Sequence, residues 1–214
     1  FASLTSKPST IAGYGITDNT WANLVDKIGA AGPTEIALGK NAGATSQGNF
    51  AVAIGQLAGE DTQGTFSVAV GNSSGKTTQG QKSVAVGYFA GQTSQGQEAV
   101  AIGSNTGLTN QGEEAIAIGE FAGMTDQGEE AIAIGKSAGQ TNQAANSIVI
   151  NATGSALENT TASSLVIQPV RNASGTHQLE YNPTTGEVTY DTLGAGGGLS
   201  DVVSDTTPQL GGAL

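Results

Sequence analysis

Hydrophobic and polar positions in the middle of the chain recur as short runs of strict alternation. Ala51-Val52-Ala53-Ile54 and Ala115-Ile116-Ala117-Ile118 are examples, with small and β-branched residues at alternate positions. A period of two with β-branched residues on one face predicts a β-strand. The opposite face carries Ala or Ser rather than charged residues, so both faces are suited to burial, as in parallel strands covered on two sides.

These runs return every 16 residues without an insertion, and each is ended by a glycine that favours a turn. The consensus is Gly-x-x-Ala-(Val/Ile)-Ala-(Ile/Val)-Gly-x-x-Ala-Gly-x-Thr-x-Gln. The predicted repeat turns are Gly39, Gly55, Gly71, Gly87, Gly103, Gly119 and Gly135. The predicted polar ladder consists of Gln47, Gln63, Gln79, Gln95, Gln111, Gln127 and Gln143.

A 16-residue repeat is too short for the paired helices of a helical solenoid, but it suits one coil of a parallel β-solenoid. Coils with two short strands would stack at about 4.8 Å, and the glutamines would hydrogen-bond to their own kind. The second, weaker strand is expected near Gln56-Leu57-Ala58-Gly59, and no proline interrupts residues 34–168. The predicted solenoid core is Val52, Ile54, Val68, Val70, Val84, Val86, Val100, Ile102, Ile116, Ile118, Ile132, Ile134, Ile148 and Ile150.

The energetics of such a thin coil favour an oligomer. Two β-branched side chains contribute roughly 1.5–3 kcal/mol each when fully buried, against about 1–2 kcal/mol of backbone entropy for every ordered residue. The flat alanine face offers a surface for another copy of the chain, and closed cyclic symmetry is the usual way to cover one. We therefore expect a homo-oligomer associating through alanine.

The segments around the repeats predict four regions. Residues 1–33 form a connector with a short helix carrying Trp21, Leu24, Val25 and Ile28, and residues 34–151 form the solenoid. Residues 152–193 form a β-rich cap with a hairpin, and residues 194–214 are a Gly-rich linker and the start of a further segment. The solenoid is expected to end near residue 151, because Val149 replaces the usual alanine. The chain is expected to be part of a longer protein.

Composition and charge exclude several classes of function. The net charge is −11, from 7 Lys+Arg against 18 Asp+Glu, which argues against nucleic acid as a partner. The chain has no cysteine, and no apolar run approaches the roughly 20 residues that a membrane span requires. We expect an all-β protein with no cofactor and no membrane insertion.

Candidate chemistry is sparse. His177 is the only histidine, and no motif makes it a catalytic base, so we expect no enzyme and no catalytic residue. Glu113-Glu114 and Glu129-Glu130 occupy matching positions in consecutive coils, where a hard cation would relieve their repulsion. A solvated acidic rim is the favoured alternative, so no metal site is predicted. The columns of Phe50 with Phe66 and of Phe89 with Phe121 suit either packing at turns or a sugar-binding strip.

The Ser67-Val68-Ala69-Val70-Gly71 and Ser83-Val84-Ala85-Val86-Gly87 steps resemble the head repeats of trimeric autotransporter adhesins, the YadA-like heads. The resemblance covers residues 34–151 and implies a left-handed parallel β-roll with three chains around one axis.

The flanking segments resemble bacteriophage fibre proteins. Residues 6–18 are similar to a segment of tail fibres, residues 199–212 to a linker of marine phage fibres, and residues 181–190 to a hairpin that follows solenoids. The resemblance implies a virion tail fibre whose homotrimeric shaft holds a receptor-binding tip, with other fibre segments or tail proteins as partners and the host surface contacted indirectly. The alternatives are a bacterial surface adhesin whose β-roll itself binds host glycan or matrix and, less favoured, a tailspike depolymerase.

Overall fold

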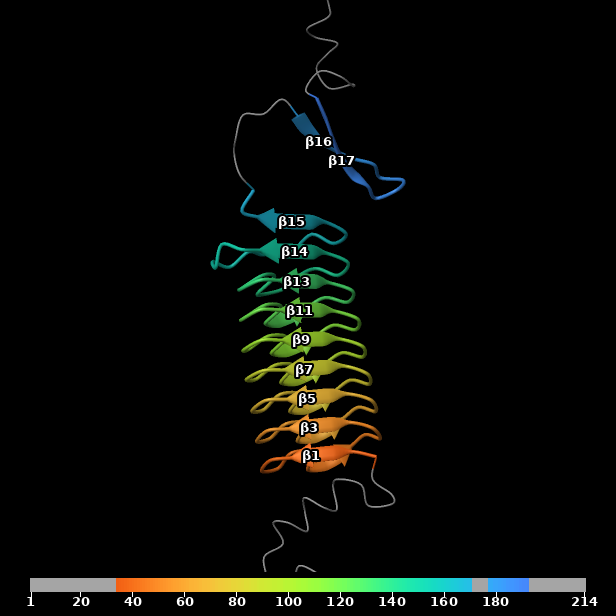
Figure 1. Cartoon of the computed structure of the whole chain (residues 1–214), viewed down its shortest axis with the longest axis vertical. Helices are drawn as coiled ribbons and strands as arrows, with labels where there is room; N and C mark the ends of the chain where they lie inside the picture. The colour runs from red at the N-terminus through yellow and green to blue at the C-terminus, as the bar shows by residue number, and fades with distance from the viewer. Residues whose placement is uncertain (1–33, 171–176, 193–214) are drawn as a thin grey trace, which may run out of the picture. The chain divides into compact units, whose positions relative to one another are not determined.

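The computed structural model describes residues 34–170 and 177–192, which fall into two units divided after Pro169. In the first unit the chain winds into a stack of coils spaced 16 residues apart (Figure 1). The described residues contain strands and turns but no helix, and the helix predicted around Trp21 lies outside them. The predicted all-β parallel solenoid with a 16-residue coil is confirmed.

The first strand of each coil joins a nine-stranded parallel sheet that runs the length of the stack. Strands in adjacent coils pair in a constant register, so that Val52 lies opposite Val68 and Ala53 opposite Ala69. The strands are β1 (Ile36–Leu38), β3 (Val52–Ile54), β5 (Val68–Val70), β7 (Val84–Val86), β9 (Val100–Ile102), β11 (Ile116–Ile118), β13 (Ile132–Ile134), β14 (Ile148–Asn151) and β15 (Leu165–Gln168).

The second strand of each coil joins a six-stranded parallel sheet, and it lies later in the repeat than predicted. The segment Gln56–Gly59 is a turn, with a φ of 60° at Leu57 and of 52° at Gly59. The strands end on the glutamine instead: β2 (Thr45–Gln47), β4 (Asp61–Gln63), β6 (Thr77–Gln79), β8 (Thr93–Gln95), β10 (Thr109–Gln111) and β12 (Thr125–Gln127).

The stack continues beyond residue 151, where it was expected to end. Strand β15 pairs in parallel with β14, with Ile148 opposite Leu165 and Val149 opposite Val166. Val149 is fully buried, and Leu157, in the connection between the two strands, packs against its cluster. The coil from β14 to β15 is 17 residues long instead of 16, and one further strand is added.

The second unit contains an antiparallel hairpin of β16 (His177–Tyr181) and β17 (Val188–Thr192). The backbone N–H of Gly186 donates to the carbonyl of Asn182, and the Asn182 side chain accepts from the backbone N–H of Thr184. Asn182-Pro183 is therefore followed by the tight turn that its residue types favour.

No helix in the described residues is long and apolar enough to cross a membrane.

Candidate functional site: an apolar stripe on the nine-stranded sheet

The two faces of the nine-stranded sheet are the reverse of the prediction. From β3 to β13 the alanine at the centre of each strand points into the coil and is fully buried, as is the alanine or serine directly before each of these strands, whereas Ala37 in β1 is partly buried. The predicted core residues, Val52, Ile54 and their equivalents, point outward, and the isoleucines at the strand ends are 38–40% exposed in Ile54, Ile102, Ile118, Ile134 and Ile150. The assignment of the valines and isoleucines to the solenoid interior is therefore wrong.

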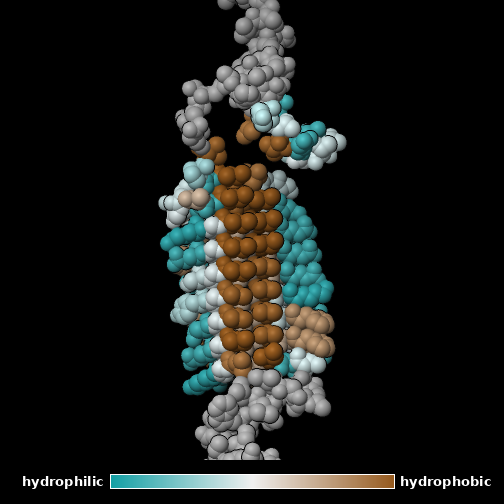
Figure 2. Space-filling view, in the orientation of Figure 1, coloured by the Kyte–Doolittle hydropathy of each residue, from teal (hydrophilic) through white to brown (hydrophobic). Residues whose placement is uncertain are grey.

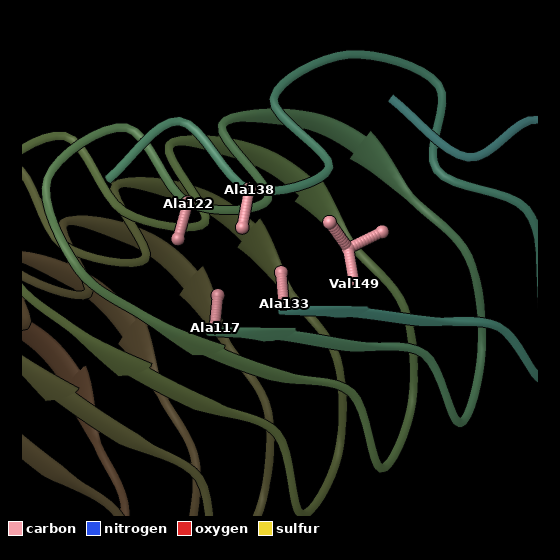
Figure 3. Close-up of a cluster of buried hydrophobic side chains, with 5 residues drawn as sticks. All are labelled: Ala117, Ala122, Ala133, Ala138 and Val149. Carbon is pink, nitrogen blue, oxygen red and sulfur yellow. The ribbon is translucent and has the colours of Figure 1, made fainter. Parts of the chain in front are cut away.

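The thinness of the coil explains this reversal. The interior holds small side chains from both halves of each coil, for example Ala117 and Ala133 facing Ala122 and Ala138 (Figure 3). A Cβ added at Gly59 would lie 2.6 Å from the side-chain Oε1 of Gln63, so the interior has no spare volume even for one methyl group. Interiors packed to this density exclude larger side chains, and the β-branched residues are left outside.

The outward residues form one continuous apolar surface, called here the apolar stripe. Figure 2 shows it as two adjacent columns of hydrophobic side chains with hydrophilic residues along both sides. Nine strands at about 4.8 Å spacing make it roughly 40 Å long. A contiguous apolar patch of this size on an outer face indicates an interaction surface. The stripe consists of the fourteen residues predicted as core together with Ile36, Leu38, Leu165 and Ile167.

The glutamine column is buried inside the coils and hydrogen-bonded along the axis. The Nε2 atom of Gln95 donates to the Oε1 atom of Gln111 at 3.1 Å and to the Val84 carbonyl at 2.9 Å. The same pattern links every step from Gln79 to Gln143. The Oε1 atoms of Gln47, Gln63 and Gln79 have no hydrogen-bond partner, so the amide ladder begins only at the third of the seven glutamines.

The predicted repeat turns occupy the end of each strand of the nine-stranded sheet. All seven glycines, Gly39 to Gly135, have φ between 106° and 138°, a region that L side chains rarely adopt. A Cβ at Gly55 would lie 2.4 Å from the carbonyl oxygen of Gly71 in the next coil. These positions require glycine both for conformation and for close stacking.

Three further positions in each coil place a residue other than glycine in the left-handed region. Examples are Leu57, Thr62 and Phe66, with φ of 60°, 55° and 61°. At such positions the backbone N–H donates to the preceding coil, as from Leu57 to the Lys40 carbonyl, from Phe66 to the Asn49 carbonyl and from Asn142 to the Thr125 carbonyl, all at 2.9 Å. The inter-coil hydrogen bonds therefore include these positions and offset the cost of the strained conformation.

Exposed aromatic residues flank the stripe at one end. Phe50 and Phe66 are 53% and 56% exposed, with ring centroids 5.0 Å apart and ring planes within 3° of parallel. Each ring thus covers one face of the other, as packing at turns predicts. Tyr88 packs on the neighbouring Phe89 rather than on a residue of the next coil.

Acidic residues occupy the same turn position in several later coils. Lys82 and Glu98 form an ion pair at 2.7 Å, and its hydrogen bond raises the pKa of Lys82 and lowers the pKa of Glu98. Glu114 and Glu130 follow at the same position in later coils. Within the described residues no group of three His, Cys, Asp or Glu side chains is placed to hold a metal ion. His177 begins β16, but its side chain lies outside what is described.

Comparison with known families gives one match. The family model for the YadA head domain repeat matches residues 36–58 in two copies, which corresponds to the first two strands of the nine-stranded sheet. The chain therefore carries YadA-like β-roll repeats, and the later coils keep the same register and residue columns. No curated protein and no solved structure matches the chain.

Proposed function

We propose that this chain is a segment of a homotrimeric extracellular fibre and that the apolar stripe is the surface through which three copies associate. The supporting observation is that the stripe is outward, continuous and apolar, while the coil interior is already filled by alanine and glutamine. Three stripes facing one axis would remove their side chains from water with closed symmetry. YadA-like domains form homotrimers, and the left-handed winding of their β-rolls is the handedness proposed here.

Within the fibre we propose a mechanical role, as the shaft of a phage tail fibre that holds a receptor-binding tip. Each coil is hydrogen-bonded to the next through strands, turns and buried amides, so bending the shaft must break several ladders together. The similarity of the flanking segments to phage fibres supports the virion setting. A fibre exposed on a bacterial surface is the alternative setting, because YadA-like domains occur on extracellular surface fibres.

Self-association is tested by introducing a charge into the stripe. Ile102→Lys together with Ile118→Lys should convert a trimer into monomers in light scattering after size-exclusion chromatography, because buried lysines at the axis would repel. Ser94→Lys together with Asn110→Lys is the matched control, since these exposed residues lie on the six-stranded sheet and not on the stripe. A wild-type monomer, or a trimer that persists with both stripe lysines, would refute the proposal.

The second candidate is an adhesin whose β-roll surface itself binds glycan or matrix, and the match to a head domain repeat favours it. Deleting residues 81–112 removes two whole coils and keeps every column in phase. A labelled wild-type trimer is applied to an array of glycans and matrix proteins beside the shortened one. A passive shaft predicts no signal from either, whereas a signal that falls with the deletion supports the adhesin.

A further inference from the structure

The apolar stripe by itself does not specify how far each chain is displaced along the fibre axis. Its side chains are Val, Ile or Leu in every coil, so neighbouring chains that slip by one coil still place eight of the nine strands against equivalent residues. A uniform ladder of this kind specifies register weakly. Residues that differ from coil to coil must therefore distinguish the aligned arrangement from the slipped ones.

The residues along the two edges of the stripe do differ from coil to coil. Phe50 and Phe66 lie at the edge where the strands begin, preceded in their column by Thr34 and followed by Lys82. Leu57 lies at the opposite edge, after β3 has ended, and its neighbours in the column are Asn41 and Ser73. The edge where the strands begin thus carries an apolar residue at both β3 and β5, and the opposite edge carries one at β3, each bordered by polar residues in the adjoining coils.

Cyclic symmetry brings these two edges together. In a ring of three copies each contact is heterologous, so the edge where strands begin on one copy meets the edge where strands end on the next. Phe50 precedes β3, Leu57 follows β3 and Phe66 precedes β5, and Figure 2 shows a lighter hydrophobic patch beside the same end of the stripe. In aligned chains this aromatic pair would therefore stand nearest to the neighbour's Leu57. A slip by one coil replaces Leu57 with Asn41 or Ser73.

We propose that the Phe50–Phe66 pair packs against Leu57 of a neighbouring copy and thereby selects the trimer in which all three chains are axially aligned. This inference rests on the proposed self-association through the stripe. It accounts for two exposed phenylalanines in adjacent coils beside an apolar surface. Both rings are more than half exposed, and both residues have a left-handed backbone conformation that phenylalanine rarely adopts. A slip by two coils would bring the rings near Phe89 of the neighbouring copy, which is also apolar. That slip leaves only seven of the nine strands of each copy opposite equivalent strands of its neighbour.

The test uses cysteine pairs at different heights in the full chain, which has no cysteine of its own. Chains with Ile102→Cys are co-expressed with size-tagged chains carrying Ile134→Cys, two coils away and so displaced by about 9.6 Å along the axis. That separation exceeds the reach of a disulfide, roughly 7 Å between Cα atoms. Mixed disulfides then form only between slipped chains, so the ratio of mixed disulfides to disulfides between identical chains measures the slip. Val100→Cys with Ile132→Cys repeats the measurement on the second column of the stripe.

Phe50→Asn with Phe66→Asn is the informative variant, because asparagine tolerates the left-handed conformation and the rings contribute nothing to the coil interior. It should remain trimeric and raise the yield of mixed disulfides several-fold over wild type, and Leu57→Asn should do the same from the opposite edge. Glu114→Asn with Glu130→Asn, at the same turn position in later coils, should leave the yield unchanged.

Three outcomes would overturn the inference, and each is separable from failure of the self-association itself. A trimer whose mixed yield is unchanged in both phenylalanine and leucine variants would show that alignment is set elsewhere. Monomeric phenylalanine variants would show that the rings drive association instead of alignment. A third measurement uses the variant Phe66→Trp in a chain whose own Trp21 is replaced by Phe, so that the new tryptophan is the only one. Its fluorescence should be shielded from acrylamide quenching in the trimer, and full quenching would show that no neighbouring copy covers the ring position. A monomeric wild type would instead remove the proposed function.

Discussion

The buried amide ladder predicts a large and position-dependent cost for removing one glutamine. Gln111 accepts a hydrogen bond from Gln95 at 3.1 Å, and its Nε2 atom donates to Gln127 at 3.2 Å, to the Val100 carbonyl at 2.9 Å and to the Ala115 carbonyl at 3.4 Å. The substitution Gln111→Met keeps the length of the side chain and removes all of these bonds. It leaves the carbonyl oxygens and the amide groups of the two neighbouring glutamines without that partner.

The expected magnitude follows from the number of buried groups left unsatisfied. Each costs about 1–3 kcal/mol, and the more apolar methionine side chain regains part of the loss, so we expect the free energy of unfolding to fall by about 2–4 kcal/mol. Gln47→Met is the matched substitution at the start of the same column. Gln47 donates only to the carbonyls of Ile36 and Ala51, and its Oε1 atom has no partner, so its loss should be about 1 kcal/mol.

Urea unfolding followed by far-UV circular dichroism measures both variants at one protein concentration, because association would otherwise shift the midpoint. The difference between the two substitutions is the informative quantity, since it isolates the bonds between glutamines. Equal losses, or a loss below about 0.5 kcal/mol for Gln111→Met, would refute the idea that the ladder stabilises the stack.

Three further substitutions examine a turn, a strand position with a positive φ and the ion pair. Gly59→Ala should destabilise the coil by about 1–3 kcal/mol, because its Cβ would meet Gln63; a midpoint within error of wild type in the same urea titration would contradict this packing. Thr78→Asn, at an exposed position with a φ of 56°, should stabilise the protein by about 1 kcal/mol, and a lower melting temperature would count against the strain argument. Glu98→Gln should lower the melting temperature slightly at neutral pH. Lys82 lowers the pKa of Glu98, so the ion pair stabilises the folded state at any pH above the ordinary pKa of a glutamate. This stabilisation is lost as the pH falls through the lowered pKa of Glu98. The two melting curves should therefore converge in acid, and a difference that grows in acid would reverse the assigned sign.

The repeat made most of the architecture predictable from the sequence. The sequence repeats glycine, glutamine and a run of alternating small and β-branched residues every 16 positions. This pattern predicts a stack of short coils, which the structure has. Spacing reports register directly, since residues in one column become neighbours across a parallel ladder, as Val84 and Val100 do. The glutamine column was found for the same reason, although its break before Gln79 depends on side-chain geometry and has no signal in the sequence.

Only the tertiary structure decided which face of the strands is inside. Hydrophobicity assigns Val100 and Ile102 to the core and Ala101 to the outside, yet Ala101 is fully buried and Ile102 is 39% exposed. The alternation in the sequence shows that each strand has two different faces, but it does not show which face points into the coil. That depends on the distance between the two halves of one coil. That distance suits alanine, serine and an extended glutamine, with Thr106 and Val149 as the larger exceptions, so most of the apolar residues are left outside, where a second copy of the chain can cover them.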